Sequence, residues 1–225
     1  MKLTWYGHAS FRVTANDGTA IVLDPYTPET SGYSAVRDPA DLVIASSDND
    51  SFHCRHDLIP GSPDFVNALT VAEGGGSTDW RGLGIKAIQT MEMDGHPTHD
   101  PEQNAMYRFT VDGVDIAHMG DVGNPLSPRQ IDFLSGADVL LALTGDVPTI
   151  RLPDLKVAID EAAPRIVVPM HFRTLTYRPR NGLWVESFLS LFRDEDIDFA
   201  FAPEITLTPD DIPAKTRVLV MDYAR

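Results

Sequence analysis

A succession of short apolar runs, rich in β-branched residues and separated by turn residues, constrains the fold more than any other feature of the chain. Runs of this length and composition are typical of β-strands. Twelve of them are present, at residues 2–6, 10–14, 19–24, 41–46, 68–73, 84–91, 105–111, 114–119, 137–143, 165–170, 197–202 and 217–222. Twelve strands are too many for one simple Rossmann sheet, so the sequence predicts more than one sheet.

Two Asp-Gly pairs predict tight hairpins between neighbouring strands. They lie within residues 16–19 and 111–115, and Asp-Gly favours the positive φ that a two-residue hairpin turn needs. Antiparallel pairs are therefore expected to mix with crossover connections. The glycine-rich segment 73–82 lies between apolar runs and predicts a loop rather than a domain boundary.

The clearest helix start is at Ser127. This serine can cap the helix, Pro128 suits the first helical position, and Gln130 completes a capping box. Further helices are expected over residues 152–163 and 183–193. Strand-rich stretches that are each followed by helices, twice along the chain, predict an α/β sandwich forming one domain over residues 1–225.

Charge and cysteine content narrow the class of partner. The chain has 33 acidic and 18 basic residues, a net charge of -15, which would repel a phosphate backbone, so nucleic acid is not expected as a partner. Residues 172–180 hold three arginines that could serve one small anionic substrate.

The single cysteine, Cys54, cannot form an internal disulfide, which fits a reducing compartment. Without a signal-peptide run or a membrane-length apolar segment, a cytoplasmic protein that binds a small molecule is expected.

Several of the seven histidines stand at the ends of predicted strands. His8 follows the first strand, His118 and Asp121 close another, His171 ends a third, and His99 lies in a loop. A divalent cation such as zinc needs three or four nitrogen or oxygen ligands from different elements. Any one of these histidines alone is more often a hydrogen-bonded packing residue. The combination of "HMGD" with "PMH" about fifty residues later is harder to explain by packing and favours a metal site.

Several segments, in the order in which they occur, resemble the metallo-β-lactamase superfamily, in the branch of small metal-dependent hydrolases related to ascorbate-phosphate lactonases. They include "WYGHASFRV", "IVLDPY", "IAHMGDVGNPLSPRQIDFL", "TGDVPTI" and "PRIVVPMHFRT", and the resemblance covers nearly the whole chain. It implies a four-layer αββα sandwich with a metal site at one edge of the two sheets. The family's ligands are a His-x-His-x-Asp-His segment, a later histidine, a bridging aspartate and a final histidine. The last three correspond to His99, Asp121 and His171.

The His-x-His-x-Asp-His segment is degenerate in this chain. Aligning Ser46 with the family's Ser or Thr places Ser47 and Asn49 where histidines belong, with Ser51 and Phe52 at the Asp-His pair. A one-residue insertion would instead bring Asp50 and His53 near that pair, with His56 and Asp57 as further candidates.

Two other acids lie in segments that resemble the family. Asp146 takes the place of a glycine in the family's loop, either as a replacement ligand or as a loop acid, and the second interpretation is favoured because Asp is a common turn residue. Asp24 in "LDPY" is expected to orient a loop rather than to bind metal.

The resemblance implies a metal-dependent hydrolase with at most one divalent metal, zinc, held by His53, His99, Asp121 and His171. Metal-activated water would attack a small ester, lactone or phosphodiester, with Asp50 or Asp48 as base. His8 would stand near the site, or its ring would anchor the first hairpin through a hydrogen bond. Ser47, Asn49 and Phe52 are expected to line the site, with Phe52 filling the space of a second metal. The alternative is a pseudoenzyme, which keeps the fold as a binding or interaction module.

Overall fold

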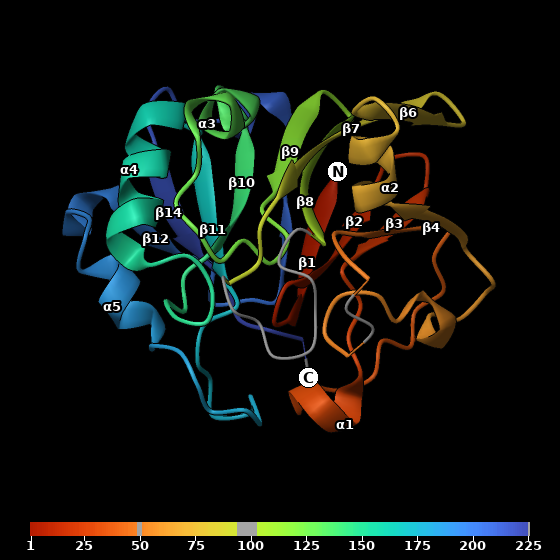
Figure 1. The fold of residues 1–225 in the computed structure, drawn as a ribbon, viewed down its shortest axis with the longest axis horizontal. Helices are drawn as coiled ribbons and strands as arrows, with labels where there is room; N and C mark the ends of the chain where they lie inside the picture. Colours follow the sequence, from red (N-terminus) through yellow and green to blue (C-terminus); the bar gives the residue numbers. More distant parts are fainter. Residues whose placement is uncertain (49–50, 94–102, 225) are drawn as a thin grey trace.

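The computed structural model describes residues 1–48, 51–93 and 103–224, and it contains two mixed β-sheets packed face to face (Figure 1). The first sheet has the order β13-β1-β2-β3-β4-β5. Its strands are β1 (Lys2–Gly7), β2 (Ser10–Thr14), β3 (Ala20–Leu23), β4 (Leu42–Ala45), β5 (Asp64–Asn67) and β13 (Glu204–Thr206). This sandwich of mixed sheets confirms the predicted fold class.

The second sheet has the order β12-β14-β11-β10-β9-β8-β7-β6. Its strands are β6 (Ser77–Trp80), β7 (Leu83–Thr90), β8 (Asn104–Val111), β9 (Val114–His118), β10 (Val139–Leu143), β11 (Ile166–Met170), β12 (Ile197–Phe199) and β14 (Arg217–Val220). Both predicted Asp-Gly hairpins are confirmed, because β2 pairs antiparallel with β3 and β8 pairs antiparallel with β9.

The main core lies between the two sheets. Leu3 and Trp5 of β1 face it, and so do alternate residues of the neighbouring strands. Strands β10 and β11 are buried at every position, as expected for parallel strands that are covered on both faces. Helices α3 (Pro128–Leu134) and α4 (Leu152–Ala162) lie beside the second sheet (Figure 1). Leu155 and Ile159 of α4 are buried and belong to the same hydrophobic cluster as the residues between the sheets.

The outer face of the first sheet is covered mainly by irregular chain. A second apolar cluster there joins Tyr6, Val22 and Val43 of the sheet to Tyr26 and Tyr33 of the following loop. That loop contains the four-residue helix α1 (Pro28–Ser31), and a 3-10 turn, η1 (His56–Leu58), precedes another buried residue of the cluster. Helices therefore form much of one outer layer and little of the other.

Three local predictions were wrong. Residues 68–73, predicted as a strand, form helix α2 (Ala68–Glu73), because the Asn67 side chain accepts hydrogen bonds from Leu69 N and Thr70 N at 2.8 and 3.4 Å and so caps a helix. The segment 73–82, predicted as a loop, contains strand β6, which pairs with β7. The helix expected over 183–193 is limited to α5 (Val185–Leu189). The capping box of Ser127 and Gln130 on α3 is confirmed.

Strand direction brings several strand ends to one edge. Strand β1 is antiparallel to β2, and β2 to β3, so β1, β3 and β4 run in the same direction. In the other sheet β9, β10 and β11 are mutually parallel. The chain that leaves β11 meets the chain that leaves β1, because His171 N donates to His8 O at 3.1 Å. Across the described ranges, no helix combines the length and the apolar character that a membrane crossing requires.

Candidate metal centre

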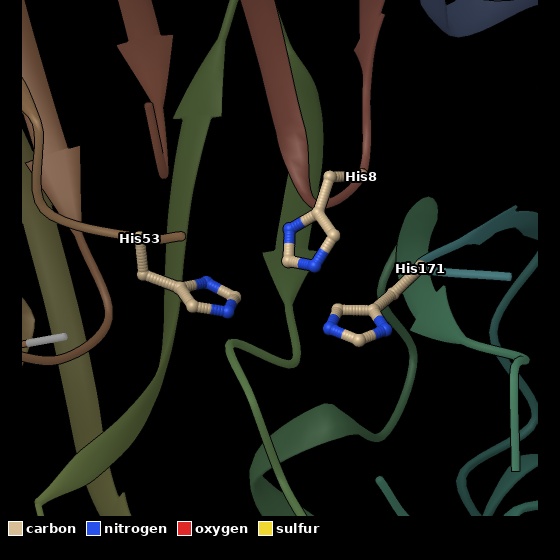
Figure 2. A group of neighbouring side chains, drawn as sticks. All are labelled: His8, His53 and His171. Atoms are coloured by element: carbon tan, nitrogen blue, oxygen red, sulfur yellow. The ribbon is translucent and has the colours of Figure 1, made fainter. Parts of the chain in front are cut away.

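Three histidines from different parts of the chain converge at this edge (Figure 2). His8 follows β1, His53 lies in the loop after β4, and His171 follows β11. One ring nitrogen of each lies within 4.8 Å of those of the other two. His8 and His171 have φ values of 52° and 55°, a region that non-glycine residues rarely adopt. These sharp bends at the two strand ends turn both side chains toward the cluster.

The ring nitrogens of this cluster are buried. His8, His53 and His171 are 1%, 0% and 8% exposed. Within the described part of the chain, neither ring nitrogen of His8 nor Nε2 of His53 makes a hydrogen bond. A buried polar atom without a partner is costly, and such atoms are rare in native proteins. Imidazole nitrogens that converge without hydrogen bonds therefore fit a metal ion.

Asp121 lies against two of these histidines. Its Oδ2 lies 3.4 Å from His53 Nε2 and its Oδ1 lies 3.5 Å from His171 Nε2. The expected approach of Asp121 to His171 is therefore present. Asn104 Oδ1 accepts a hydrogen bond from Asp121 N at 3.0 Å, which fixes the backbone that carries the carboxylate.

Asp24, a fully buried residue at the end of β3, orients His53. Its Oδ2 bonds to His53 Nδ1 at 2.8 Å, so Nε2 is the ring nitrogen directed at the cluster. Ser46 donates both N–H and O–H to the same carboxylate, at 2.9 and 2.5 Å, and Tyr107 donates its hydroxyl at 3.0 Å. A carboxylate behind a ligand histidine is a recurrent feature of metal sites. The expectation that Asp24 has an orienting role thus agrees with its contacts.

The charges of the cluster are unequal. Burial alone would lower the pKa of His53, but the Asp121 and Asp24 carboxylates raise it to about 10. Burial lowers the pKa of His8 far below its usual value, aided by the neighbouring His171, and burial also lowers the pKa of His171. At neutral pH, His8 and His171 therefore offer lone pairs, while His53 must release a proton before it can bind a cation.

Glu92 is a buried acid beside this cluster that sequence reasoning missed. It is 2% exposed, and burial raises the pKa of its carboxyl to about 8, with Asp121 adding to the rise and His53 opposing it. Its position just after β7, between two methionines, is the only sequence feature that could have indicated burial. A lone Glu in a loop is otherwise typical of a solvated residue.

The residues that replace the family's ligands have other contacts. Phe52 stacks on His8, with ring centroids 5.1 Å apart, and so lies beside the site as expected. Ser47 is buried and pairs with Asn104 in a single β-bridge. Asp48 accepts a hydrogen bond from Asn67 Nδ2 at 2.6 Å. Three residues predicted for the site, Asn49, Asp50 and His99, lie outside the described residues.

Several other candidates have structural contacts instead. Both ring nitrogens of His118 bond to backbone atoms, Ala9 O at 2.8 Å and Gly120 N at 2.9 Å. His56 stacks on the Phe65 ring, and Asp57 pairs with Arg55. Asp146 accepts from Val147 N and Leu152 N, both at 2.9 Å, and so acts as a turn residue at the start of α4, as favoured. The His8 ring does not anchor the first hairpin, since only the backbone oxygen of His8 accepts a bond from Trp5 Nε1.

Comparison with known proteins gives consistent matches. The sequence model of the beta-lactamase superfamily domain matches residues 2–171. A UPF0173 metal-dependent hydrolase of Geobacillus thermodenitrificans is 25% identical over 202 residues, covering 77% of this chain and 86% of its own. One from Methanosarcina mazei is 25% identical over 197 residues, covering 77% of this chain and 84% of its own.

Solved structures agree in fold. A Thermotoga maritima protein, assigned to the zinc-dependent hydrolases of the metallo-beta-lactamase superfamily, superimposes with a TM-score of 0.75 and 27% identity over 99% of both chains. YhfI of Bacillus subtilis, a metallo-beta-lactamase fold protein, gives a TM-score of 0.63 at 12% identity, covering 100% of this chain and 97% of its own. The second similarity concerns the fold alone.

Proposed function

Because the chain belongs to the beta-lactamase superfamily, we propose that it is a metal-dependent hydrolase of a small ester, lactone or phosphodiester. The observation that carries this proposal is the convergence of His8, His53 and His171, in which both ring nitrogens of His8 and Nε2 of His53 are buried and lack hydrogen bonds among the described residues. The relatives named above, which are called metal-dependent hydrolases, support the same reaction class.

The ligands proposed from the described residues are these three histidines and the carboxylate of Asp121. Three or four nitrogen and oxygen donors suit zinc, which is the proposed metal. A bound divalent metal would supply a water of lowered pKa and a Lewis acid for a carbonyl or phosphoryl oxygen. A single metal is proposed because the described part of the degenerate segment contributes one ligand, His53, whereas the full motif would contribute four.

The chain's own residues hold this arrangement in place. Asp24 fixes the tautomer and the direction of the His53 ring. Asn104 holds the backbone of Asp121, and Phe52 lies against the His8 ring, where an aromatic side chain excludes water. Such fixed surroundings matter because ligands and reacting groups must be held within a few tenths of an ångström.

The net charge of -15 supports a small-molecule substrate rather than a nucleic acid. Turnover of a small phosphodiester without binding of RNA or DNA would agree with this assignment. Tight binding of either nucleic acid would contradict it.

The test combines metal analysis with hydrolysis by the same preparations. Wild type, His53→Ala and His56→Ala are purified without chelator, analysed for metal, and assayed on a panel of small esters, lactones and phosphodiesters. His56 lies in the same loop but stacks on Phe65, away from the cluster, so it is the matched control. We expect one metal per chain and hydrolysis in wild type and His56→Ala, and neither in His53→Ala. A metal-free and inactive wild type would contradict the proposal and favour the binding module.

A further inference from the structure

We propose that the Tyr177 hydroxyl donates a hydrogen bond to the substrate oxygen on which negative charge develops during hydrolysis. This oxygen is the carbonyl oxygen of an ester or lactone, or a phosphoryl oxygen of a phosphodiester. The inference rests on the proposed function, because it concerns catalysis at the same site.

The Tyr177 ring lies against two histidines of the candidate metal centre. Its centroid is 5.4 Å from that of the His8 ring and 6.2 Å from that of the His171 ring. Phe52 also contacts the His8 ring, with centroids 5.1 Å apart, but it carries no polar side-chain atom. Of these two aromatic neighbours of His8, only Tyr177 can donate a hydrogen bond to a bound molecule.

The position of Tyr177 is fixed by its neighbours. Its backbone N–H donates to Thr174 Oγ1 at 3.1 Å, and the same oxygen lies 2.9 Å from the Tyr33 hydroxyl. The Tyr33 ring stacks on the Tyr177 ring with centroids 6.3 Å apart. Tyr33 in turn packs on the backbone just before His8, where a Cβ at Gly7 would lie 2.4 Å from Tyr33 Cδ1. Tyr177 is thus held in place without the use of its own hydroxyl.

The Tyr177 hydroxyl makes no hydrogen bond within the described part of the chain, although the residue is only 4% exposed. Most buried polar groups in native proteins are hydrogen-bonded, and an unpaired one is costly. The other buried tyrosines follow this rule, since hydrogen bonds involve the hydroxyls of Tyr6, Tyr26, Tyr33 and Tyr107. The hydroxyl left for a bound molecule therefore belongs to the tyrosine that contacts both His8 and His171.

A neutral phenol suits this role. Tyrosine has an ordinary pKa of about 10 and so keeps its proton at neutral pH. Burial, and then the charge of Asp121, raises the pKa of Tyr177 further, which agrees with a hydroxyl on the side of the metal centre.

The reaction uses this hydroxyl as a donor only. When the oxygen of water bonds to the carbonyl carbon or to phosphorus, negative charge grows on the carbonyl or phosphoryl oxygen. A donor that is already in place stabilises this charge. As the bond to the leaving alkoxide breaks, the charge passes to the alkoxide, which takes up a proton from the attacking water. Tyr177 keeps its own proton throughout.

Hydrolysis by wild type, Tyr177→Phe and the control Tyr6→Phe, each loaded with zinc, tests this role on p-nitrophenyl acetate and bis(p-nitrophenyl) phosphate. Tyr6 is buried in the second apolar cluster with Tyr177, but its hydroxyl bonds to Asp38. Because the donor acts mainly in the transition state, we expect kcat to fall about 100-fold in Tyr177→Phe, with KM changed less than about threefold. Tyr6→Phe should keep the wild-type kcat. An unchanged kcat in Tyr177→Phe would overturn the proposal.

Binding of inorganic phosphate to the same zinc-loaded proteins gives a readout that needs no turnover. Phosphate is tetrahedral and carries negative charge on its oxygens, and a hydrogen bond to a charged acceptor is stronger than one to a neutral acceptor. We therefore expect the Kd for phosphate to rise at least about tenfold in Tyr177→Phe and to stay at the wild-type value in Tyr6→Phe. Equal phosphate affinity in wild type and Tyr177→Phe would overturn this inference alone.

Zinc affinity and thermal unfolding separate hydrogen-bond donation from a structural role. Phe keeps the ring against His8 and His171, so Tyr177→Phe should match wild type in its Kd for zinc and in its melting temperature. A variant that fails to fold, melts lower or binds zinc more weakly would show that the hydroxyl supports the fold or the metal centre, and would overturn the proposal. A wild type that binds no zinc would instead refute the proposed function, and this inference with it.

Discussion

At the scale of single residues, Asp24 controls which nitrogen of His53 faces the His8 and His171 rings. Its carboxylate bonds to His53 Nδ1 and also accepts from Ser46 and Tyr107. Burial raises the pKa of this carboxyl, but the His118 and His53 rings and the Ser46 hydrogen bond outweigh burial and hold it below its usual value. Asp24 is therefore an anion that the surrounding donors stabilise.

Replacing Asp24 with Asn tests this role. The NH₂ group of Asn would face one of the groups that donate to the Asp24 carboxylate, which are His53, Ser46 and Tyr107. We therefore expect metal affinity to fall about 10–100-fold and the free energy of unfolding to fall by about 1–3 kcal/mol. Metal titration and chemical denaturation measure the two effects. Asp48→Asn is the control, since Asp48 lies in the loop that carries His53 but accepts its hydrogen bond from Asn67 at the end of β5. Equal metal affinities for wild type and Asp24→Asn would contradict the orienting role.

Sequence patterns indicated some residues of the centre better than others. Asp121 and His171 were predicted as ligands, because each follows a clearly apolar strand, whereas His8 was predicted only to stand near the site or to anchor the first hairpin. His53 was one of several options, since a loop without periodicity does not fix which side chain turns inward. The burial of Glu92 was missed because the residues that contact its backbone segment, Gly123 and Asn124, are about thirty residues away in the sequence, and no local pattern reveals such a contact.

At the scale of elements, the turn after β9 delivers Asp121 through a close approach at Gly120. This glycine has a φ of 65°, and a Cβ there would lie 2.6 Å from Asn104 Oδ1 and 2.7 Å from Ser46 Cβ. The turn therefore depends both on left-handed backbone and on the absence of a side chain.

Gly120→Ala and Gly136→Ala separate these two requirements. Gly136 has a φ of 68° but nothing within 4 Å of a Cβ, so its replacement should cost only the backbone strain of about 1–2 kcal/mol. Gly120→Ala should cost about 1–3 kcal/mol more, since Asn104 or Ser46 must shift. It should also weaken metal binding by displacing Asp121. Equal losses of stability in denaturant, with equal metal affinity, would contradict the close approach.

Element type could be predicted where periodicity and caps agreed, as in α3, and was wrong where propensity and capping disagreed. The β-branched residues of 68–73 favoured a strand, but Asn67 caps a helix whose Ala68 and Leu69 are buried. Strand β6 was missed because it is short, exposed and follows three glycines, so its pairing with β7 decides its structure.

At the scale of the whole molecule, buried tyrosines make stability sensitive to alkaline pH. Burial raises the pKa of five of the six tyrosines, to about 12 for Tyr6 and Tyr33 and also upward for Tyr26, Tyr107 and Tyr177. The folded protein therefore keeps protons that the unfolded chain releases above about pH 10. Proton linkage then requires the free energy of unfolding to fall as pH rises through 10.

Absorbance at 295 nm and circular dichroism, followed together as pH rises, measure this coupling. We expect most tyrosine ionisation to coincide with loss of structure, with little ionisation before it. Reversible ionisation of all the tyrosines near pH 10, with the fold intact, would contradict this burial. Tyr6, Tyr26, Tyr33 and Tyr177 are buried in the second apolar cluster, and Tyr107 is buried against Asp24.

The most direct test of the central claim, that a metal binds at this edge of the sandwich, is thermal unfolding with and without zinc. Wild type, His171→Ala and the control His56→Ala are each scanned in chelator and in zinc. Free zinc a hundredfold above Kd should stabilise the native state by about 2.7 kcal/mol, a rise of roughly 5–10 °C for a chain of this size. We predict that rise for wild type and His56→Ala and its absence for His171→Ala, with the apo melting temperatures nearly equal. A wild-type melting temperature that zinc leaves unchanged would contradict the account.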